Sequence, residues 1–307
     1  MNRCDISVVI PVYNEEKSLD ELCRRLTDAL SGVQMEYEVI FIDDGSTDNS
    51  YKVLERFHNE YKYIKILRLV HNYGQHVALY AGFENSRGDM VITMDADLQN
   101  DPAEIYKFLD ELKKGRDAVF GWRKNRDDSF LTREVPSYIV NWLFSRFSGV
   151  RLHDYGCDFK AFNRRVVNYI LEYGSVGRVH AILGAKIAGS IAEIEIGHIK
   201  RKHGSSKYSF GQLVRLTLDI ILSYSTTPFK IVGLLGIVFL TLGTAWGGYY
   251  LVEEYLLSNL QHSPVPLLVL LFIGLQFVTL GFMGEYMIRI YDLVLVKPNY
   301  KVETFLQ

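Results

Sequence analysis

Acidic residues follow two of the short apolar segments in the first third of this 307-residue chain. Asp43 and Asp44 come after one apolar run, and Asp95 and Asp97 come after another. Paired carboxylates suit Mg²⁺ or Mn²⁺, which prefer oxygen ligands and are commonly shared with the phosphates of a substrate. An isolated D-x-D is more often a helix cap or a solvated acidic loop. The interpretation therefore depends on the elements that place these carboxylates.

Apolar residues recur in a pattern that predicts strands alternating with helices, and hence an α/β fold with a mostly parallel sheet. In such sheets ligands bind outside the carboxyl ends of the strands, which favours a metal site at Asp95 and Asp97. These two residues lie two apart in a segment expected to be extended, so that their side chains point the same way. The expected strands are Ile6–Ile10, Tyr37–Ile42, Ile64–Val70, Met90–Met94 and Ala118–Gly121, and the expected helices are Glu15–Leu30, Thr47–Tyr61, Gly74–Ser86 and Pro102–Lys114.

Several other kinds of site are disfavoured by the sequence. It has neither the G-x-G-x-x-G of a dinucleotide site nor the G-x-x-x-x-G-K-[ST] of a P-loop, so phosphate must be bound by another device. The net charge of −2 argues against a nucleic-acid binder. The three cysteines, Cys4, Cys23 and Cys157, lack C-x-x-C spacing, which indicates reduced thiols in a cytosolic domain.

Two long apolar stretches set the domain organisation. Ile231–Val252 and Ser263–Gly284 contain no charged residue, and each is long enough to cross a hydrocarbon core of about 30 Å as a helix. We therefore predict an α/β domain at 1–208, an amphipathic juxtamembrane helix at 209–230, and a membrane module at 231–307 that ends in a cytoplasmic tail.

Charges around these stretches predict their orientation. The connection between the spans holds Glu253, Glu254 and His262 but no lysine or arginine. The positive-inside rule then places the α/β domain and both termini in the cytoplasm, on a multi-pass protein of the inner or plasma membrane. The basic residues that flank the spans are Lys200, Arg201, Lys202, Lys207, Arg215 and Lys230 on one side and Arg289, Lys297 and Lys301 on the other.

Three segments at the predicted strand ends carry a family resemblance. Residues 10–15 (IPVYNE), 42–46 (IDDGS) and 95–99 (DADLQ) resemble the family 2 glycosyltransferases of GT-A fold. The closer match is to the polyprenyl-phosphate glycosyltransferases, which include dolichyl-phosphate mannose synthase, and it extends over nearly the whole chain. The resemblance implies a Rossmann-like GT-A domain, a nucleotide-sugar donor that is UDP-linked, a polyprenyl phosphate acceptor in a membrane, Mg²⁺ or Mn²⁺, and a homo-oligomer such as a tetramer.

The resemblance also implies a donor site. Asp97 and Gln99 would lie at the metal and the diphosphate, and Asp95 would line the nucleotide pocket and complete the metal-binding set. The other nucleotide-sugar-binding residues would be Pro11, Tyr13, Glu15, Ile42, Asp44, Ala96 and Arg123.

Further charged residues fall where the family places catalytic groups. Arg123, Arg201 and Lys207 would contact phosphates, for which an arginine fork or a lysine point charge is suited. Asp158 lies where some relatives carry a proposed catalytic aspartate. Because a carboxylate would repel a phosphate dianion, we expect Asp158 to orient an arginine or the metal. Asp154 is a competing candidate, and turn capping is an alternative for both.

The acceptor constrains the mechanism. A lipid monophosphate with a second pKa near 6 is largely a dianion at neutral pH and needs no general base. Catalysis then rests on positioning and on stabilising the departing UDP, and a single displacement inverts the anomeric centre.

Two alternatives to this function remain at the level of the sequence. A processive polysaccharide synthase usually has more spans and a Q-x-x-R-W motif, which is missing here. A non-enzymatic nucleotide-sugar sensor could keep the base pocket but would not need Asp97 or Lys207.

Overall fold

The computed structural model of the protein describes residues 4–123, 145, 149–173, 180–197, 227–256, 263–294 and 300–307. The chain divides into two compact units, one formed by Met1–Leu213 with Val296–Gln307 and the other by Val214–Leu295. The predicted boundary at 208 and most of the predicted helix at 209–230 lie outside the described residues and stay predictions.

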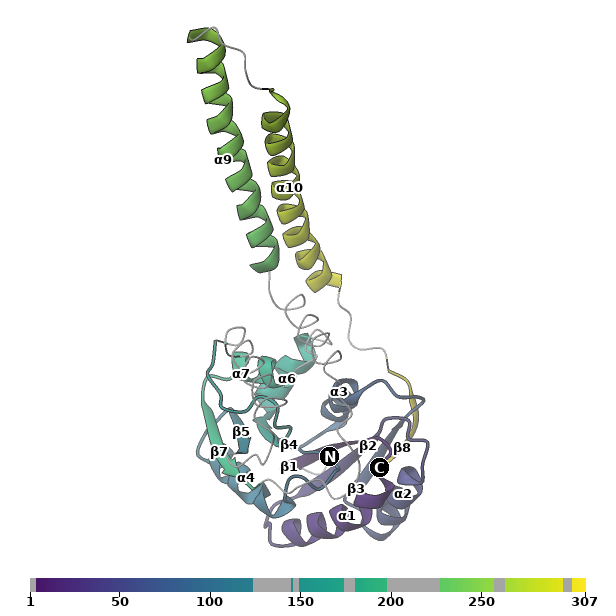
Figure 1. Ribbon diagram of the computed structural model, residues 1–307. Helices are drawn as coiled ribbons and strands as arrows, with labels where there is room; N and C mark the ends of the chain where they lie inside the picture. The colour runs from purple at the N-terminus through teal and green to yellow at the C-terminus, as the bar shows by residue number, and fades with distance from the viewer. Residues whose placement is uncertain are drawn as a thin grey trace. The chain divides into compact units, whose positions relative to one another are not determined.

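An eight-stranded sheet forms the first unit, in the order β7-β5-β6-β4-β1-β2-β3-β8 (Figure 1). The strands are β1 (Ile6–Val12), β2 (Tyr37–Asp43), β3 (Ile64–Leu69), β4 (Met90–Thr93), β5 (Ala118–Arg123), β6 (Lys160–Asn163), β7 (Ile191–Ile196) and β8 (Val302–Leu306). The neighbours β4, β1, β2 and β3 are parallel, as are β5 and β7, whereas β6 and β8 run antiparallel to their neighbours. The predicted mostly parallel α/β fold is confirmed.

Helices cover both faces of this sheet (Figure 1). They are α1 (Glu16–Ser31), α2 (Ser50–Glu60), α3 (Gln75–Asn85), the 3₁₀ turn η1 (Pro102–Glu104), α4 (Ile105–Lys113), α6 (Arg164–Tyr173) and α7 (His180–Ile187). Successive side chains of β1 point to opposite faces. Val8 and Ile10 join a core with the apolar sides of α1, α2 and α4. Val9 faces α3, where a Cβ added at Gly82 would come within 2.3 Å of its Cγ1, so glycine allows α3 to approach closely.

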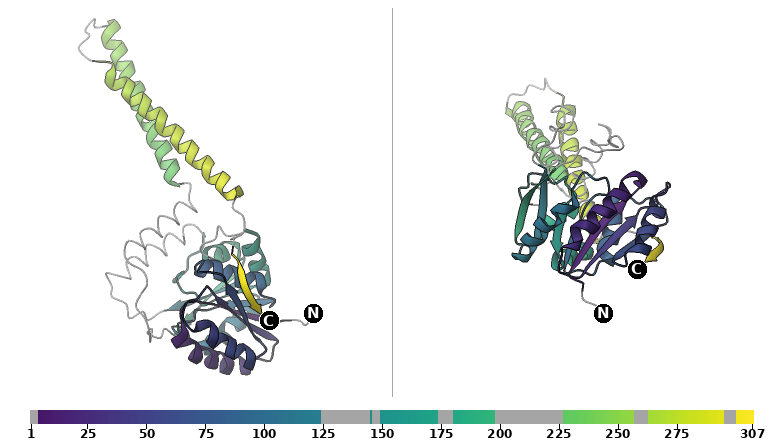
Figure 2. Two further views of the ribbon diagram at one scale, coloured as in Figure 1. Left: turned by 90° about the vertical axis from the view of Figure 1, so that its right-hand side faces the viewer. Right: turned by 90° about the horizontal axis from the view of Figure 1, so that it is seen from below.

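The polypeptide returns to this sheet after the apolar stretches. β8 pairs antiparallel with β3 and adds an edge strand (Figure 2). The Val70 amide extends the pairing by donating to the Lys301 carbonyl at 3.0 Å. The sequence analysis expects only a tail here, because a strand of five residues is too short to show a clear alternation.

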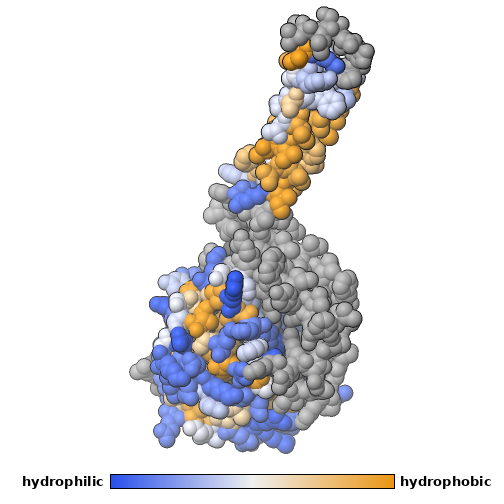
Figure 3. All heavy atoms as spheres, turned by 60° about the vertical axis from the view of Figure 1, so that its left-hand side comes forward, coloured by the Kyte–Doolittle hydropathy of each residue, from blue (hydrophilic) through white to orange (hydrophobic). Residues whose placement is uncertain are grey.

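Two long helices, α9 (Thr227–Leu256) and α10 (Val265–Val294), form the described part of the second unit. Both are long and apolar enough to cross a membrane, with candidate spans at Phe229–Glu253 and Val265–Met287. Apolar side chains cover much of the face that Figure 3 shows, and Phe282 is 72% exposed. An apolar surface of this extent suits contact with lipid.

Glycines allow α9 and α10 to pack closely. A Cβ added at Gly236 would lie 2.5 Å from the Val278 amide nitrogen, and one added at Gly281 would lie 2.8 Å from the Gly233 Cα. Small residues at such contacts let the backbones of membrane helices approach each other. The helices α9 and α10 therefore pack closely against each other.

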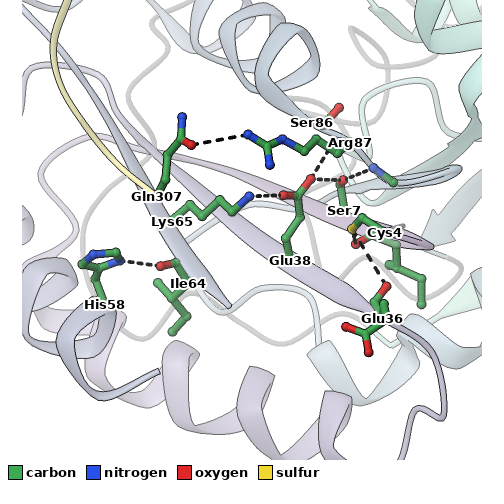
Figure 4. Close-up of polar contacts among 12 residues, drawn as sticks. Cys4, Ser7, Glu36, Glu38, His58, Ile64, Lys65, Ser86, Arg87 and Gln307 are labelled. Carbon is green, nitrogen blue, oxygen red and sulfur yellow. Dashed lines mark hydrogen bonds and ion pairs between the residues drawn. The ribbon is translucent and has the colours of Figure 1, made fainter. Parts of the chain in front are cut away.

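A buried carboxylate joins the amino-terminal ends of three neighbouring strands (Figure 4). Glu38 of β2 is 3% exposed and accepts hydrogen bonds from Ser7 Oγ of β1 at 2.6 Å and from Lys65 Nζ of β3 at 2.6 Å. The Arg87 amide donates to it at 2.7 Å. Burial alone would raise the pKa of Glu38, but the Lys65, Ser7 and Arg87 hydrogen bonds lower it below its ordinary value. Ionised Glu38 therefore stabilises the sheet.

Replacing Glu38 with glutamine keeps the size of the side chain and removes the charge that holds Lys65. We expect Glu38→Gln to lower the free energy of unfolding of the full chain in detergent by about 1–3 kcal/mol at neutral pH. Because the folded-state pKa is lowered, this contribution is present above the unfolded-state pKa and is lost as pH falls through the folded-state value. The exposed Glu36 supplies the control Glu36→Gln. An equal loss in both variants, or one that does not vary with pH, would contradict this account.

Candidate active site

The candidate site lies at the carboxyl edge of the central parallel strands, where the sequence analysis places it. Pro11 and Ile42 are register partners on β1 and β2, so two of the predicted donor-site residues lie side by side. The loops that follow these strands carry Tyr13, Glu15 and Asp44. The order of the strands thus brings together residues that lie about thirty positions apart in the sequence.

Reciprocal hydrogen bonds hold the loops after β1 and β2 to each other. The Asn14 amide donates to Ser46 Oγ at 3.0 Å, and Asn14 Oδ1 accepts from the Thr47 amide at 2.8 Å. The Glu15 amide donates to Ser50 Oγ at 2.9 Å. Asn14 adopts a left-handed backbone with φ of 54°, a conformation that is kept only where surrounding contacts enforce it. The backbone that presents Tyr13 and Glu15 is therefore preorganised.

Asp44 fixes a third loop. It is buried, and its two carboxylate oxygens accept hydrogen bonds from the Tyr73 and Gly74 amides, each at 2.8 Å. Burial raises the pKa of Asp44, and the two amide hydrogen bonds oppose that shift. Gly45, with φ of +67°, lies so close to this loop that an added Cβ would stand 2.5 Å from the His71 carbonyl carbon. Asp44 therefore sets the position of the β3–α3 connection.

A second cluster forms around Asp95 and Asp158. The Gln75 side-chain amide donates to Asp95 Oδ1 at 2.8 Å and to Asp158 Oδ2 at 3.0 Å. Lys160 Nζ donates to Asp158 Oδ1 at 2.8 Å. Thr93 at the end of β4 pairs with Lys160 on β6, which explains why Asp158 lies beside Asp95. Gln75 and Lys160 are site residues that the sequence analysis misses, although Gln75 starts a helix at a predicted strand end.

The cluster carries an excess of negative charge at Asp95. Burial and the negative charges of Asp158 and Asp97 raise the pKa of Asp95 well above its ordinary value. Burial alone would raise the pKa of Asp158, but Lys160, together with His76 and Arg123, lowers it below its ordinary value. A divalent cation beside Asp95 and Asp97 would offset the repulsion, so this surplus of carboxylate charge fits Mg²⁺ or Mn²⁺.

The backbone around Asp97 differs from the expected extended form. β4 ends at Thr93, residues 96–100 bend, and Leu98 has a φ of 61°. The bend is stabilised by the Gln99 amide, which donates to Asp97 Oδ1 at 3.1 Å, and by a contact between the Gln99 side-chain amide and Asp97 Oδ2. Among the described residues no group of three or more His, Cys, Asp or Glu side chains is arranged to hold a metal. Asp95 and Asp97 would thus need oxygens from the substrate to complete a coordination shell.

Arg123 is held by Asp154. Its Nε and Nη2 donate to the Asp154 carboxylate at 2.7 and 3.1 Å, and both side chains are nearly buried. The Asp154 contact raises the pKa of Arg123 even though burial opposes the shift. Among the described residues Asp154, the competing candidate, binds this arginine, whereas Asp158 pairs with Lys160. The expectation that Asp158 orients an arginine or the metal stays a prediction.

Cys157 lies between these two aspartates in the sequence but has a packing role. It is fully buried, and burial raises the pKa of its thiol to about 12. A thiol of this kind is not a nucleophile at neutral pH. The predicted catalytic residues Arg201 and Lys207 lie outside the described residues.

Comparison with known proteins identifies the class of protein to which this fold and this acidic edge belong. Residues 7–171 match the model of Glycosyl transferase family 2, so the chain belongs to this family and is a glycosyltransferase. It is 40% identical, over 98% of its length and 92% of the relative's, to undecaprenyl-phosphate 4-deoxy-4-formamido-L-arabinose transferase of Shewanella sediminis (strain HAW-EB3). This similarity agrees with the sequence motifs, which indicate the polyprenyl-phosphate transferase group. Within that group the motif segments look most like the same arabinose transferase.

Solved structures confirm the fold. Glucosyl-3-phosphoglycerate synthase from Mycobacterium tuberculosis, in complex with Mn²⁺, UDP and glucosyl-3-phosphoglycerate, matches with a TM-score of 0.51 at 16% identity, over 72% of this chain and 80% of that chain. The same enzyme with Mg²⁺ and UDP matches over 72% and 79%, with a TM-score of 0.51 and 16% identity. At this level of identity the likeness establishes the GT-A-like architecture of the sheet domain.

The Arg123–Asp154 pair gives a testable consequence. Asp154→Asn leaves a nearly buried guanidinium without its counter-charge, which we expect to cost about 3–5 kcal/mol in the free energy of unfolding and to abolish transfer. The double variant Arg123→Met/Asp154→Leu, with apolar groups in both positions, should recover most of the stability and remain inactive. Denaturant unfolding and product formation would be measured on all three. Activity in the double variant would show that Arg123 has no part in the reaction.

Proposed function

We propose that this glycosyltransferase moves a sugar from a UDP-linked donor onto undecaprenyl phosphate at the cytoplasmic face of the inner membrane. The observation that carries the proposal is the carboxylate cluster around Asp95, at the carboxyl edge of a GT-A-like sheet, in a chain that also contains two membrane-length apolar helices. The arabinose transferase of Shewanella sediminis, named for an undecaprenyl-phosphate acceptor, supports the choice of acceptor.

The donor would bind across the loops after β1, β2 and β4. Tyr13 is 37% exposed at this edge and offers an aromatic face for a base, next to Glu15. Arg123, fixed by Asp154, offers a guanidinium for phosphate oxygens. The proposed donor-binding set is Pro11, Tyr13, Glu15, Ile42, Asp44, Asp95, Ala96, Gln99 and Arg123.

Asp95 and Asp97, with Gln99 beside them, would hold Mg²⁺ or Mn²⁺ together with the donor diphosphate. When bound, the cation supplies positive charge that stabilises the leaving diphosphate. The Mycobacterium tuberculosis synthase that shares the fold was crystallised with Mn²⁺ or Mg²⁺, which supports a divalent cation without showing one in this chain.

The transfer would be a single displacement. An oxygen of the lipid phosphate dianion attacks the anomeric carbon of the sugar, the bond between that carbon and the UDP oxygen breaks, and UDP leaves from the opposite face with inversion. No general base is needed, because the nucleophile is largely a dianion at neutral pH. Lys160 lowers the repulsion between Asp158 and an incoming phosphate, and Arg201 and Lys207 are proposed as further cationic contacts.

The return of the chain to the sheet supports the proposed topology. β8 follows α10, and its partner β3 precedes α9, so strands on both sides of the helical pair belong to one sheet. Both ends of the pair must then lie on the same side of a membrane. Positive-inside orientation places that side in the cytoplasm. A homo-oligomer stays a prediction of the family resemblance.

The direct test is to mix purified full-length protein in detergent with undecaprenyl phosphate and a panel of nucleotide sugars that includes UDP-4-deoxy-4-formamido-L-arabinose. Mass spectrometry of the lipid would name the donor and the acceptor together. We expect a glycosylated undecaprenyl phosphate from a UDP donor, lost on addition of EDTA and restored by Mg²⁺ or Mn²⁺. A product made only from a non-UDP donor, or one made equally well with EDTA, would refute that part of the proposal.

Asp97→Ala is expected to abolish transfer, because it removes a carboxylate of the proposed metal site. The variant should stay folded and membrane-associated. Asp110→Asn, at an exposed position on α4, is the matched control and should transfer at the normal rate. Normal transfer by Asp97→Ala would show that the reaction does not need Asp97 as a metal ligand.

Asp158→Asn is expected to lower kcat by about tenfold or more, because it removes the charge that holds Lys160 while keeping the size of the side chain. Thermal unfolding of the same preparation separates this loss from misfolding. An unchanged kcat would reduce Asp158 to a turn residue.

A further inference from the structure

The chain that follows the second membrane-length helix contacts the candidate active site through one loop. This β3–α3 loop comprises residues 70–74. The Lys301 carbonyl accepts from the Val70 amide at 3.0 Å, and the Lys301 amide donates to the Tyr73 hydroxyl at 3.1 Å. Tyr300 Oη donates to Glu84 Oε2 on α3 at 2.6 Å. Residues 300–301 therefore contact both the loop and the helix that it begins.

The other side of the β3–α3 loop is fixed by Asp44, whose carboxylate binds the Tyr73 and Gly74 amides. His71 stacks on Tyr73 with ring centroids 3.8 Å apart. Gly74 has a φ of +93°, which a residue with a Cβ rarely adopts. The loop is thus clamped between the end of β2 and the segment before β8, and it ends at Gln75.

Gln75 occupies a particular place in the cluster. Its side-chain nitrogen lies between Asp95 and Asp158, at 2.8 Å from one carboxylate and 3.0 Å from the other. Asp95 belongs to the strand end that carries the proposed donor site, and Asp158 belongs to the segment before β6. A neutral donor shared by two carboxylates attracts both and sets their separation without adding charge.

We propose that Gln75 is a positioning residue that holds Asp95 and Asp158 at their working separation, and that residues 300–301 keep it in place through the β3–α3 loop. The segment just before β8 then helps to align the proposed catalytic groups. The inference rests on the proposed function in taking Asp95 and Asp158 as parts of the transferase site.

The first test is a double-mutant cycle on Gln75 and Asp158. Gln75→Leu keeps the bulk of the side chain and removes its donor, so we expect kcat to fall by about tenfold or more. The KM for UDP-4-deoxy-4-formamido-L-arabinose, with undecaprenyl phosphate as acceptor, should stay within about threefold of the wild-type value. In the Asp158→Asn background, where the carboxylate that Gln75 binds at this position is gone, Gln75→Leu should lower kcat by less than about twofold. If Gln75→Leu lowers kcat by the same factor in both backgrounds, the proposal is overturned. Independent structural defects would give that result, because their free-energy losses add.

The second test concerns residues 300–301, just before β8. Tyr73→Phe removes only the hydroxyl that accepts from the Lys301 amide, and we expect kcat to fall by about threefold to tenfold with an unchanged unfolding midpoint. Glu303→Gln is the matched control, because it breaks the ion pair between Glu303 on β8 and Arg68 on β3 without changing a residue that contacts the β3–α3 loop. Equal kcat values for the two variants would overturn the role of residues 300–301.

The outcome also separates this inference from the proposed function. Asp97→Ala, assayed in parallel, reports on the transferase site itself. Wild-type kcat in Gln75→Leu beside an inactive Asp97→Ala would refute the positioning role and leave the proposed function in place. Absence of any lipid product from the wild-type protein would refute the proposed function first.

Discussion

The antiparallel pairing of β6 with β4 is the contact on which the site depends. Thr93 pairs with Lys160, and the Thr93 hydroxyl donates to the Asp158 carbonyl at 2.8 Å across 65 positions of sequence. Only this register places the ammonium of Lys160 and the carboxylate of Asp158 beside Asp95. Since β6 also pairs with β5, the same strand brings the segment that holds Arg123 into reach. One short strand therefore assembles groups from three parts of the chain.

Concentrating carboxylates in this way is unfavourable for folding, and the surrounding structure offsets the cost locally. Asp44 is satisfied by backbone amides, Asp154 by an arginine, and Asp158 by a lysine. Asp95 carries the least compensated charge, as the rise in its pKa indicates. Left-handed residues at Asn14 and Leu98 lie in loops at the same edge, where strain is commonly retained for function. Elsewhere, as at Glu38, buried charge serves stability alone.

The sequence predicts the central sheet well because β1 to β4 are buried on both faces and carry β-branched runs with helical segments between them. Knowing the carboxyl edge then locates Asp95, whereas Pro11 and Ile42 are indicated by the family resemblance. The bend at Asp97 escapes prediction, because it depends on a side-chain bond to Gln99 and a positive φ at Leu98. Gln75, Lys160 and the partner of Arg123 escape it too, because their contacts follow from the insertion of β6 between β4 and β5, which no local pattern signals.

β8 is made late in the synthesis of the chain, which affects when the sheet can close. Its five residues emerge from the ribosome only after both apolar helices, yet their partner β3 is made near the start. Until β8 has been made, the outer edge of β3 stays open, with unpaired backbone groups that could recruit another strand. Closure of the sheet is thus deferred until both apolar helices have been synthesised.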